Sequence, residues 1–236
     1  EKGLRDGILG ILNGIDYEVW DPKIDGAIFH KYDIDNCEDG KRNNKEDLLK
    51  TLSLVDKPTF CFIGHMAKQK GIDVLLKAIK RIKKIDFNLV LLGTGDPNIE
   101  KSISRVAKFY PLNIRPIFDY NENLAHKLYA GSDFIVIPSH FEPCGLIQMV
   151  AMKYGTIPLA SETGGLKDSI ASGKNGIFFK KNSPSSLVKT IKHVLMLYEN
   201  PNQLKSMRVS AMKTDFSWGK SAKEYLRLYE KLIIGS

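Results

Sequence analysis

Residues 138–166, PSHFEPCGLIQMVAMKYGTIPLASETGGL, contain the pattern that decides the fold. The stretch follows an apolar run and passes through a loop into a helix over residues 145–154 that is apolar on nearly every side. It then returns to a short strand over residues 156–160 and ends in a second glycine-rich loop that opens another helix. A strand, a buried helix and a second strand in this order predict one step of a parallel sheet.

Both loops of this stretch end where a helix is predicted to start. Free backbone N–H groups and the positive end of a helix dipole suit a phosphate at such a place, so we expect residues 145–147 to bind an anion. The argument is weaker for Gly164-Gly165, because a tight turn alone can demand glycine. Glu142 lies between the loops, and its carboxylate would repel phosphate, so a neutral polyol such as a sugar is its expected ligand. These residues together predict a nucleotide-sugar site.

The same alternation of strand and helix extends along the chain in both directions. The predicted strands are residues 59–64, 87–93, 113–118, 133–138, 156–160 and 176–179. Helical patterns connect them, and three more helices follow, after Ser183, over residues 201–213 and after Ser217. The chain is therefore predicted to be an α/β protein with a Rossmann-like parallel sheet and helices on both faces.

The first part of the chain lacks this alternation. Turn signals at Asn13-Gly14 and Asp21-Pro22 interrupt it, and a polar, charged stretch with one helical patch around residues 45–54 follows. We therefore expect residues 1–56 to be a connector with little regular structure. A nucleotide-sugar-binding domain over residues 57–214 and a terminal helical segment over residues 215–236 complete the predicted organisation.

Composition narrows the classes of partner. The formal net charge of +8 favours anionic partners, but lysines such as Lys77, Lys80 and Lys84 fall on polar helix faces without interleaved aromatics, so small phosphorylated molecules are favoured over nucleic acid. No apolar run approaches the ~20 residues of a membrane span, which predicts no membrane partner. Three widely separated cysteines predict neither a disulfide framework nor structural zinc, and they suit a reducing compartment.

Lys70 is a further candidate for phosphate binding, because it directly precedes the helix that starts at Gly71, on the carboxyl edge of the predicted sheet. His65 follows a strand end on the same edge. Gly93-Thr94-Gly95 resembles a dinucleotide fingerprint, but the third glycine would fall at Asn98, so only proximity to phosphate or ribose is expected. The histidines show no metal-binding spacing, and no serine nucleophile arrangement can be assembled.

Several of these motifs recur, in the same order and spacing, in bacterial glycogen synthases and plant starch synthases, which the chain resembles over nearly its whole length. The shared motifs are Asn13-Gly14-Ile15-Asp16, Gln69-Lys70-Gly71, Gly93-Thr94-Gly95-Asp96, Phe141-Glu142-Pro143-Cys144-Gly145-Leu146, Tyr154-Gly155-Thr156, Thr163-Gly164-Gly165-Leu166 and Asp215-Phe216-Ser217-Trp218.

The resemblance implies one half of a GT-B fold, the donor-binding half of a retaining glucosyltransferase. Such enzymes transfer glucose from ADP-glucose or UDP-glucose to the non-reducing end of an α-1,4-glucan, without a metal or other cofactor. The family also has an N-terminal domain that carries most of the acceptor groove, and its last helix crosses back to that domain. We therefore expect residues 1–236 to bind nucleotide but not to synthesise glucan efficiently, and we expect an apolar strip on the last helix. Cytoplasm or plastid stroma is the expected location.

The resemblance also implies roles for individual residues. Lys70 and the residue at position 65 would hold the diphosphate, Glu142 would contact the glucose hydroxyls, and Tyr120 would lie by the base. The catalytic set is Glu142, Lys70 and His65, and the donor-binding set is Tyr120, Cys144, Gly145, Leu146, Ile147, Thr163, Gly164, Gly165, Gly93 and Gly95.

Two departures from the family pattern affect the expected activity. His65 and His140 stand where the family has arginine, and a neutral histidine supplies neither the permanent charge nor the bidentate geometry of arginine. We expect slow or pH-dependent turnover that rises where His65 is protonated. Two alternatives stay open: a nucleotide-sugar transferase with another acceptor, and a degenerate synthase that binds glucan or partners without turnover.

Overall fold

The computed structural model describes residues 9–234, and its centre is a six-stranded parallel sheet in the order β3-β2-β1-β4-β5-β6. The strands are β1 (Thr59–Ile63), β2 (Asn88–Leu92), β3 (Ile114–Ile117), β4 (Phe134–Ile137), β5 (Ile157–Ser161) and β6 (Ile177–Phe179). Every pair of neighbouring strands is parallel. The predicted Rossmann-like α/β sheet is confirmed.

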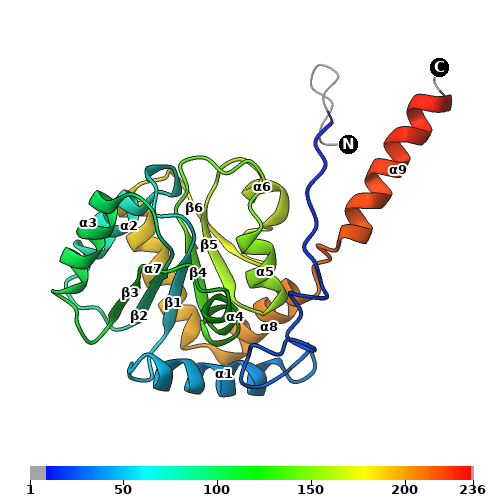
Figure 1. The fold of residues 1–236 in the computed structure, drawn as a ribbon. Helices are drawn as coiled ribbons and strands as arrows, with labels where there is room; N and C mark the ends of the chain where they lie inside the picture. The colour runs from blue at the N-terminus through cyan, green and yellow to red at the C-terminus, as the bar shows by residue number, and fades with distance from the viewer. Residues whose placement is uncertain (1–8, 235–236) are drawn as a thin grey trace.

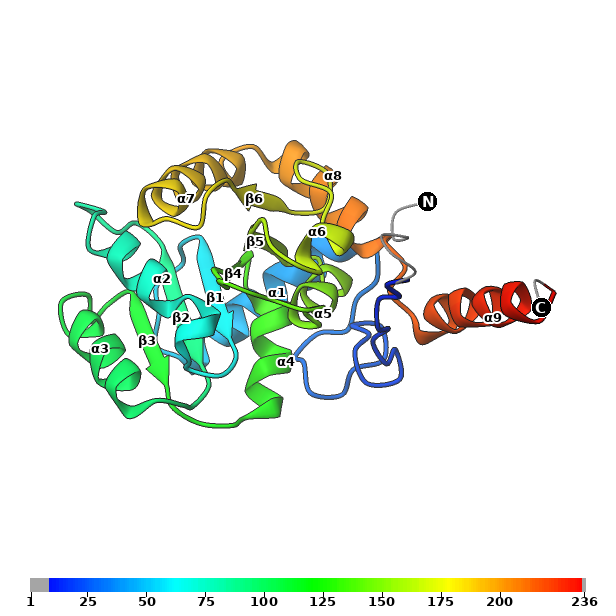
Figure 2. The same ribbon diagram turned by 90° about the horizontal axis from the view of Figure 1, so that it is seen from above.

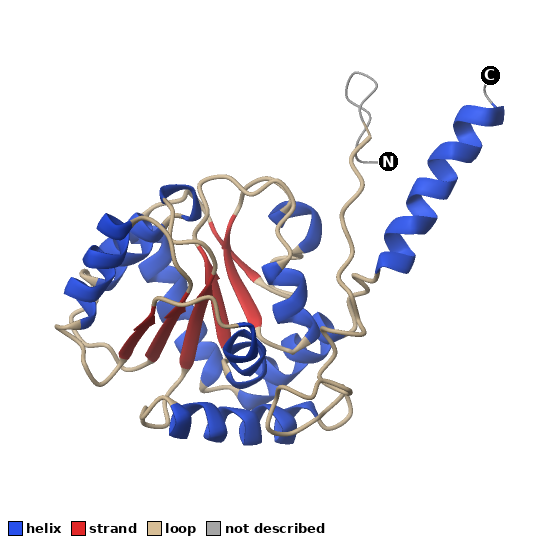
Figure 3. Cartoon of the chain, in the orientation of Figure 1, coloured by secondary structure: helices blue, strands red, loops and turns tan. Residues whose placement is uncertain are grey.

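Helices cover both faces of this sheet (Figures 1 and 3). They are α1 (Cys37–Thr51), α2 (Ile72–Ile79), α3 (Pro97–Ala107), α4 (Glu122–Gly131), α5 (Ile147–Lys153), α6 (Leu166–Ser169), α7 (Pro184–Tyr198), α8 (Pro201–Met212) and α9 (Trp218–Ile234), with a 3₁₀ turn, η1, at Lys68–Lys70. Helix α2 packs against α3 and α7 on one face, and α4 packs against α1 and α5 on the other (Figure 2). Side-chain caps fix several helix starts: Ser183, for example, accepts a hydrogen bond from the Ser186 N–H, and Pro184 follows it.

The order of the strands reverses between β1 and β4, and the two strands separate there. Strand β1 pairs with β2 along its whole length, as far as Ile63 and Leu92. With β4 it pairs only at Phe60↔Phe134 and Cys61↔Ile135. Beyond these pairs the carboxyl ends of β1 and β4 diverge, and a crevice at such a switch point is where open α/β sheets bind ligands.

The expectation that residues 1–56 form a connector with little regular structure is wrong for much of that segment. Helix α1 has 15 residues and begins well before the expected helical patch. Tyr32, Leu48 and Leu49 are buried in the same core as the sheet.

Two buried lysines explain why a charged segment was wrongly predicted to lack regular structure. Lys41 is 3% exposed and donates hydrogen bonds to the carbonyl oxygens of Tyr129, in the last turn of α4, and of Ser132, just after that helix. Lys45 Nζ lies 2.8 Å from Asp133 Oδ2. These two lysines of α1 therefore face the protein, where carbonyl and carboxylate oxygens compensate for lost hydration.

Helix α9 projects from the body of the molecule (Figures 1 and 2). It is held at its base, where the Ile15 N–H donates to the carbonyl oxygen of Phe216 at 2.8 Å. Trp218, Leu226 and Tyr229 are at least half exposed, which confirms the expected apolar strip on the last helix. Within residues 9–234, no helix combines the length and apolar character needed to cross a membrane.

Candidate functional site

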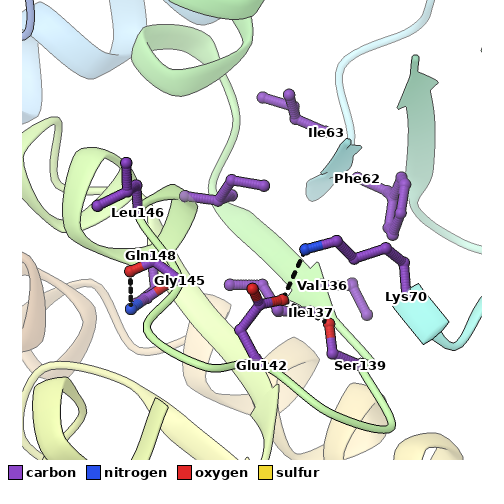
Figure 4. Close-up of a pocket in the computed structure, with 11 residues that line it drawn as sticks. Phe62, Ile63, Lys70, Val136, Ile137, Ser139, Glu142, Gly145, Leu146 and Gln148 are labelled. Carbon is purple, nitrogen blue, oxygen red and sulfur yellow. Dashed lines mark hydrogen bonds and ion pairs between the residues drawn. The ribbon is translucent and has the colours of Figure 1, made fainter. Parts of the chain in front are cut away.

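A pocket of about 140 Å³ opens where β1 and β4 diverge (Figure 4). Strand-end side chains form its apolar wall, and the segments that follow the strands, including the first turn of α5, supply its polar groups. Its lining consists of Phe62, Ile63, Lys70, Val136, Ile137, Ser139, Glu142, Gly145, Leu146, Ile147 and Gln148. The sheet topology thus brings together residues that lie up to 86 positions apart, from Phe62 to Gln148.

Lys70 reaches the pocket because the chain turns sharply after it. Gly71 has a φ of 70°, and a Cβ at this position would lie 1.7 Å from the carbonyl oxygen of Pro138. Only glycine permits both this backbone conformation and this close approach. The turn therefore packs on the loop after β4 and holds η1 against it.

Lys70 and Glu142 point toward one another across the pocket (Figure 4). Lys70 Nζ lies 2.7 Å from Glu142 Oε2, and Ser139 Oγ donates to the same oxygen at 3.1 Å. Glu142 is 8% exposed, so this is a largely buried ion pair. Within the described chain, Glu142 Oε1 accepts no hydrogen bond. Oε2 thus contacts Lys70 and Ser139, and Oε1 remains able to accept a hydrogen bond from a ligand hydroxyl.

His140 anchors the loop that carries Glu142. Its Nε2 lies 2.9 Å from Asp73 Oδ1, and Asn182 Nδ2 lies 3.2 Å from its Nδ1. Burial alone would raise the pKa of Asp73, but the hydrogen bond and charge of His140, together with Lys77, lower it overall. His140 does not line the pocket, and these contacts tie the loop to the starts of α2 and α7.

The loop before α5 and the loop before α6 differ in the hydrogen bonds of their backbone N–H groups. In the part of the chain that the structure describes, the N–H groups of Leu146, Ile147 and Gln148 donate to no protein acceptor. The Gly165 N–H instead donates to the Glu142 carbonyl at 2.9 Å, and a Cβ on Gly164 would lie 2.0 Å from that oxygen. Close packing of the second loop on the first therefore accounts for its glycines, and their contact with an anion stays a prediction.

Several predicted site residues lie outside the pocket lining. His65 is exposed, and Tyr120, on the loop after β3, is 88% exposed. Gly93 and Gly95 are required by close packing, since a Cβ would lie 2.0 Å from the Gly64 carbonyl oxygen and 2.5 Å from that of Met66, respectively. Cys144, Thr163, Gly164 and Gly165 are also absent from the lining.

Gln148 and Ser139 line the pocket and were missed by the sequence reasoning. Gln148 is fully buried, and its Oε1 has no hydrogen-bond partner within residues 9–234. A polar residue near the start of the mostly apolar helix of residues 145–154 was the available signal. Ser139 lies two residues after the end of β4, on the edge where open α/β sheets bind ligands.

Comparison with known proteins identifies related sequences and structures. Residues 43–208 match the family model described as glycosyl transferases group 1. A glycogen synthase of Thermodesulfovibrio yellowstonii is 40% identical over 232 residues, which make up 97% of this chain and 46% of that protein. A glycogen synthase of Caldicellulosiruptor saccharolyticus is also 40% identical, over 98% of this chain and 50% of the relative. The chain thus spans about half the length of the curated relatives that it matches.

Solved structures give the same picture. The catalytic domain of starch synthase IV from Arabidopsis thaliana, bound to ADP and acarbose, aligns with a TM-score of 0.87 and 34% identity, over 94% of this chain and 48% of that one. Sucrose-phosphate synthase from Thermosynechococcus elongatus aligns with a TM-score of 0.65 and 25% identity, over 81% of this chain and 49% of that one.

Proposed function

Because the chain belongs to the group 1 glycosyl transferases, we propose that it is the donor-binding part of a glucosyltransferase that extends an α-1,4-glucan from ADP-glucose or UDP-glucose. The observation that carries the proposal is the Lys70–Glu142 ion pair in a pocket at the switch point of the sheet. Identities near 40% to glycogen synthases support glucose as the transferred sugar.

The pocket offers complementary groups to the two parts of a nucleotide sugar. Lys70 and the unpaired N–H groups of Leu146 and Ile147 can hold the diphosphate, and Glu142 can accept hydrogen bonds from sugar hydroxyls. In this proposal the diphosphate displaces Glu142 from Lys70, and the released carboxylate turns to the sugar. Charge grows on the diphosphate as the bond to the sugar breaks, and preorganised cationic and N–H groups stabilise it.

The nucleotide and the reaction partners are proposed from the relatives. The starch synthase IV structure contains ADP, which favours ADP-glucose as donor. Tyr120 and His65 would approach the nucleotide from the exposed rim of the pocket. The acceptor glucan would bind against a further part of the enzyme, and the exposed strip of α9 would contact that part. Three free cysteines suit a reducing compartment such as cytoplasm or plastid stroma.

A second candidate function is glucan or partner binding without turnover. His65 stands where the resemblance expects an arginine, and its side chain is exposed outside the pocket lining. A third, transfer of a nucleotide sugar to another acceptor, has support from the likeness to sucrose-phosphate synthase.

A calorimetric titration of the 236-residue chain with ADP and with UDP tests the leading proposal. We expect a dissociation constant in the micromolar range for at least one nucleotide, with the tighter ligand identifying the donor. Absence of binding by both nucleotides at millimolar concentration would contradict a donor site and favour the second candidate.

A further inference from the structure

Gln148 is the buried polar residue of the pocket to which the proposed function assigns no role. It is fully buried in the first turn of α5. Its Nε2 donates to the carbonyl oxygens of Gly145 at 2.6 Å and Cys144 at 3.2 Å, and it also lies 3.0 Å from Ser169 Oγ. The two carbonyl oxygens beside this nitrogen fix the orientation of the amide, because the reverse orientation would place Oε1 against both of them.

These hydrogen bonds determine where the loop amides point. The described peptide bonds are trans, and in a trans peptide the C=O of one residue is antiparallel to the N–H of the next. Since the carbonyls of Cys144 and Gly145 point at Gln148, the N–H groups of Gly145 and Leu146 point away from it. Both residues line the pocket, and their N–H groups have no acceptor in the described chain.

Gln148 also links the first loop to the second. Ser169 Oγ, which accepts from Gln148, lies within hydrogen-bond distance of the carbonyl oxygens of Gly165 and Leu166. The Gly165 N–H in turn donates to the carbonyl oxygen of Glu142. The Gln148 side chain thus connects the peptides of Cys144 and Gly145 with the second loop, whose Gly165 contacts the backbone of Glu142.

We propose that Gln148 is a positioning residue whose amide holds the Cys144 and Gly145 carbonyls inward, so that the following N–H groups stay directed at the diphosphate of a nucleoside-diphosphate sugar. The inference rests on the proposed donor site. Gln148 leaves its own Oε1 buried and unpaired. Such an atom costs stability, which is consistent with a residue retained for the geometry of the site.

The geometry at Gly145 supports this role. Gly145 has a φ of 74°, and a Cβ there would lie 2.5 Å from Gln148 Oε1 and 3.0 Å from Nε2. The glycine therefore allows the amide to lie directly beneath the loop. A side chain at this position would displace the amide that orients the peptides, so Gly145→Ala is expected to weaken diphosphate binding in the same way as loss of Gln148.

Calorimetry with ADP on three variants of the 236-residue chain tests the inference. Gln148→Met keeps the volume but removes the donor, and we expect ADP affinity to fall by about 10- to 100-fold, the effect of losing well-placed hydrogen bonds to a charged group. Gln203→Met, the same change at an exposed position of α8, is the matched control and should bind ADP as the original chain does.

Gln148→Glu separates positioning from packing. A protonated glutamic acid can donate to one loop carbonyl, whereas an ionised one repels both, so ADP affinity relative to the original chain should recover as pH falls from 8 to 5.5. Circular dichroism would verify that each variant is folded at each pH, and Gly145→Ala replaces Gln148→Met if the latter does not fold.

The outcomes distinguish the proposed function from the role of Gln148. If the original chain binds neither ADP nor UDP, the proposed function fails, and the inference fails with it. If the original chain binds ADP, two results would overturn the role of Gln148 alone. One is that folded Gln148→Met binds ADP within twofold of the affinity of the original chain. The other is that the ADP affinity of Gln148→Glu does not recover as the pH falls.

Discussion

Lys70 Nζ lies 2.7 Å from Glu142 Oε2, so the cation and the anion of the pocket form one ion pair across the divergence of β1 and β4. In the proposed function, a diphosphate would compete with Glu142 for the lysine. This competition would couple the two halves of the proposed ligand, because the carboxylate would be released toward the sugar only when the phosphates take its place.

Replacing Glu142 should separate its competition with the diphosphate from its contact with the sugar. Glu142→Gln removes the competing charge, so we expect ADP to bind a fewfold more tightly, while the intact enzyme loses most of its turnover because the sugar hydroxyls lose a charged acceptor. Calorimetry with ADP and a glucan-extension assay would measure the two quantities. Weaker ADP binding with unchanged turnover would contradict the proposed exchange of partners.

The close approach of Gly71 to Pro138 predicts a large cost for any side chain there. Gly71→Ala must relieve a 1.7 Å contact with a carbonyl oxygen and also adopt a positive φ, so we expect destabilisation above about 3 kcal/mol. Gly173→Ala is the matched control: its φ is 83°, but no atom lies within 4 Å of the added Cβ, so only the conformational cost of about 1 kcal/mol applies. Urea denaturation measures both values, and equal costs would show that the close approach does not matter.

Lys41 predicts a pH-dependent stability. Burial, followed by the charge of Arg208, lowers its pKa to about 7, whereas an unfolded lysine titrates near about 10.4. Between these values the unfolded chain binds more protons than the folded chain, so the stability contributed at this site rises with pH. The unfolding free energy of the original chain minus that of Lys41→Met should therefore rise from pH 7 to pH 9.5. A constant difference across this range would refute the lowered pKa.

His65 predicts a gain of activity on substitution. An arginine at this position would add a permanent charge and a longer reach toward the diphosphate, so His65→Arg should raise turnover of the intact enzyme at neutral pH, by as much as about 10²-fold. Steady-state rates of the two enzymes at neutral pH would test this, and unchanged turnover would dismiss it.

The positions of the six strands could be predicted because the local sequence signals for strands and helices agree with the fold. All six strands lie where apolar runs such as TFCFI and FIVI end in glycine, proline or polar residues, and the motif order placed Lys70 and Glu142 on one edge. Their ion pair depends on the φ of Gly71 and on the packing of η1 against the loop after β4. Such long-range contacts leave no periodic signal in the sequence.

The error at α1 has a physical cause. This helix was assigned to a connector because its sequence is polar and charged, whereas Lys41 and Lys45 are buried against oxygens of Tyr129, Ser132 and Asp133. Gly93, Gly95 and Gly164 each accommodate a backbone carbonyl of a neighbouring loop, and their contact with the donor stays a prediction. Charge and glycine content alone do not reveal whether the partner is solvent, ligand or protein.

ADP affinity of Lys70→Ala, compared with that of the original chain and of Lys68→Ala, tests the central claim most directly. Lys68 is an exposed lysine of the same 3₁₀ turn, so its removal changes the net charge equally without touching the pocket. The account predicts that Lys70→Ala weakens ADP binding by about 10- to 100-fold and that Lys68→Ala changes it by less than about threefold. Equal affinities of the two variants would contradict a diphosphate site at Lys70.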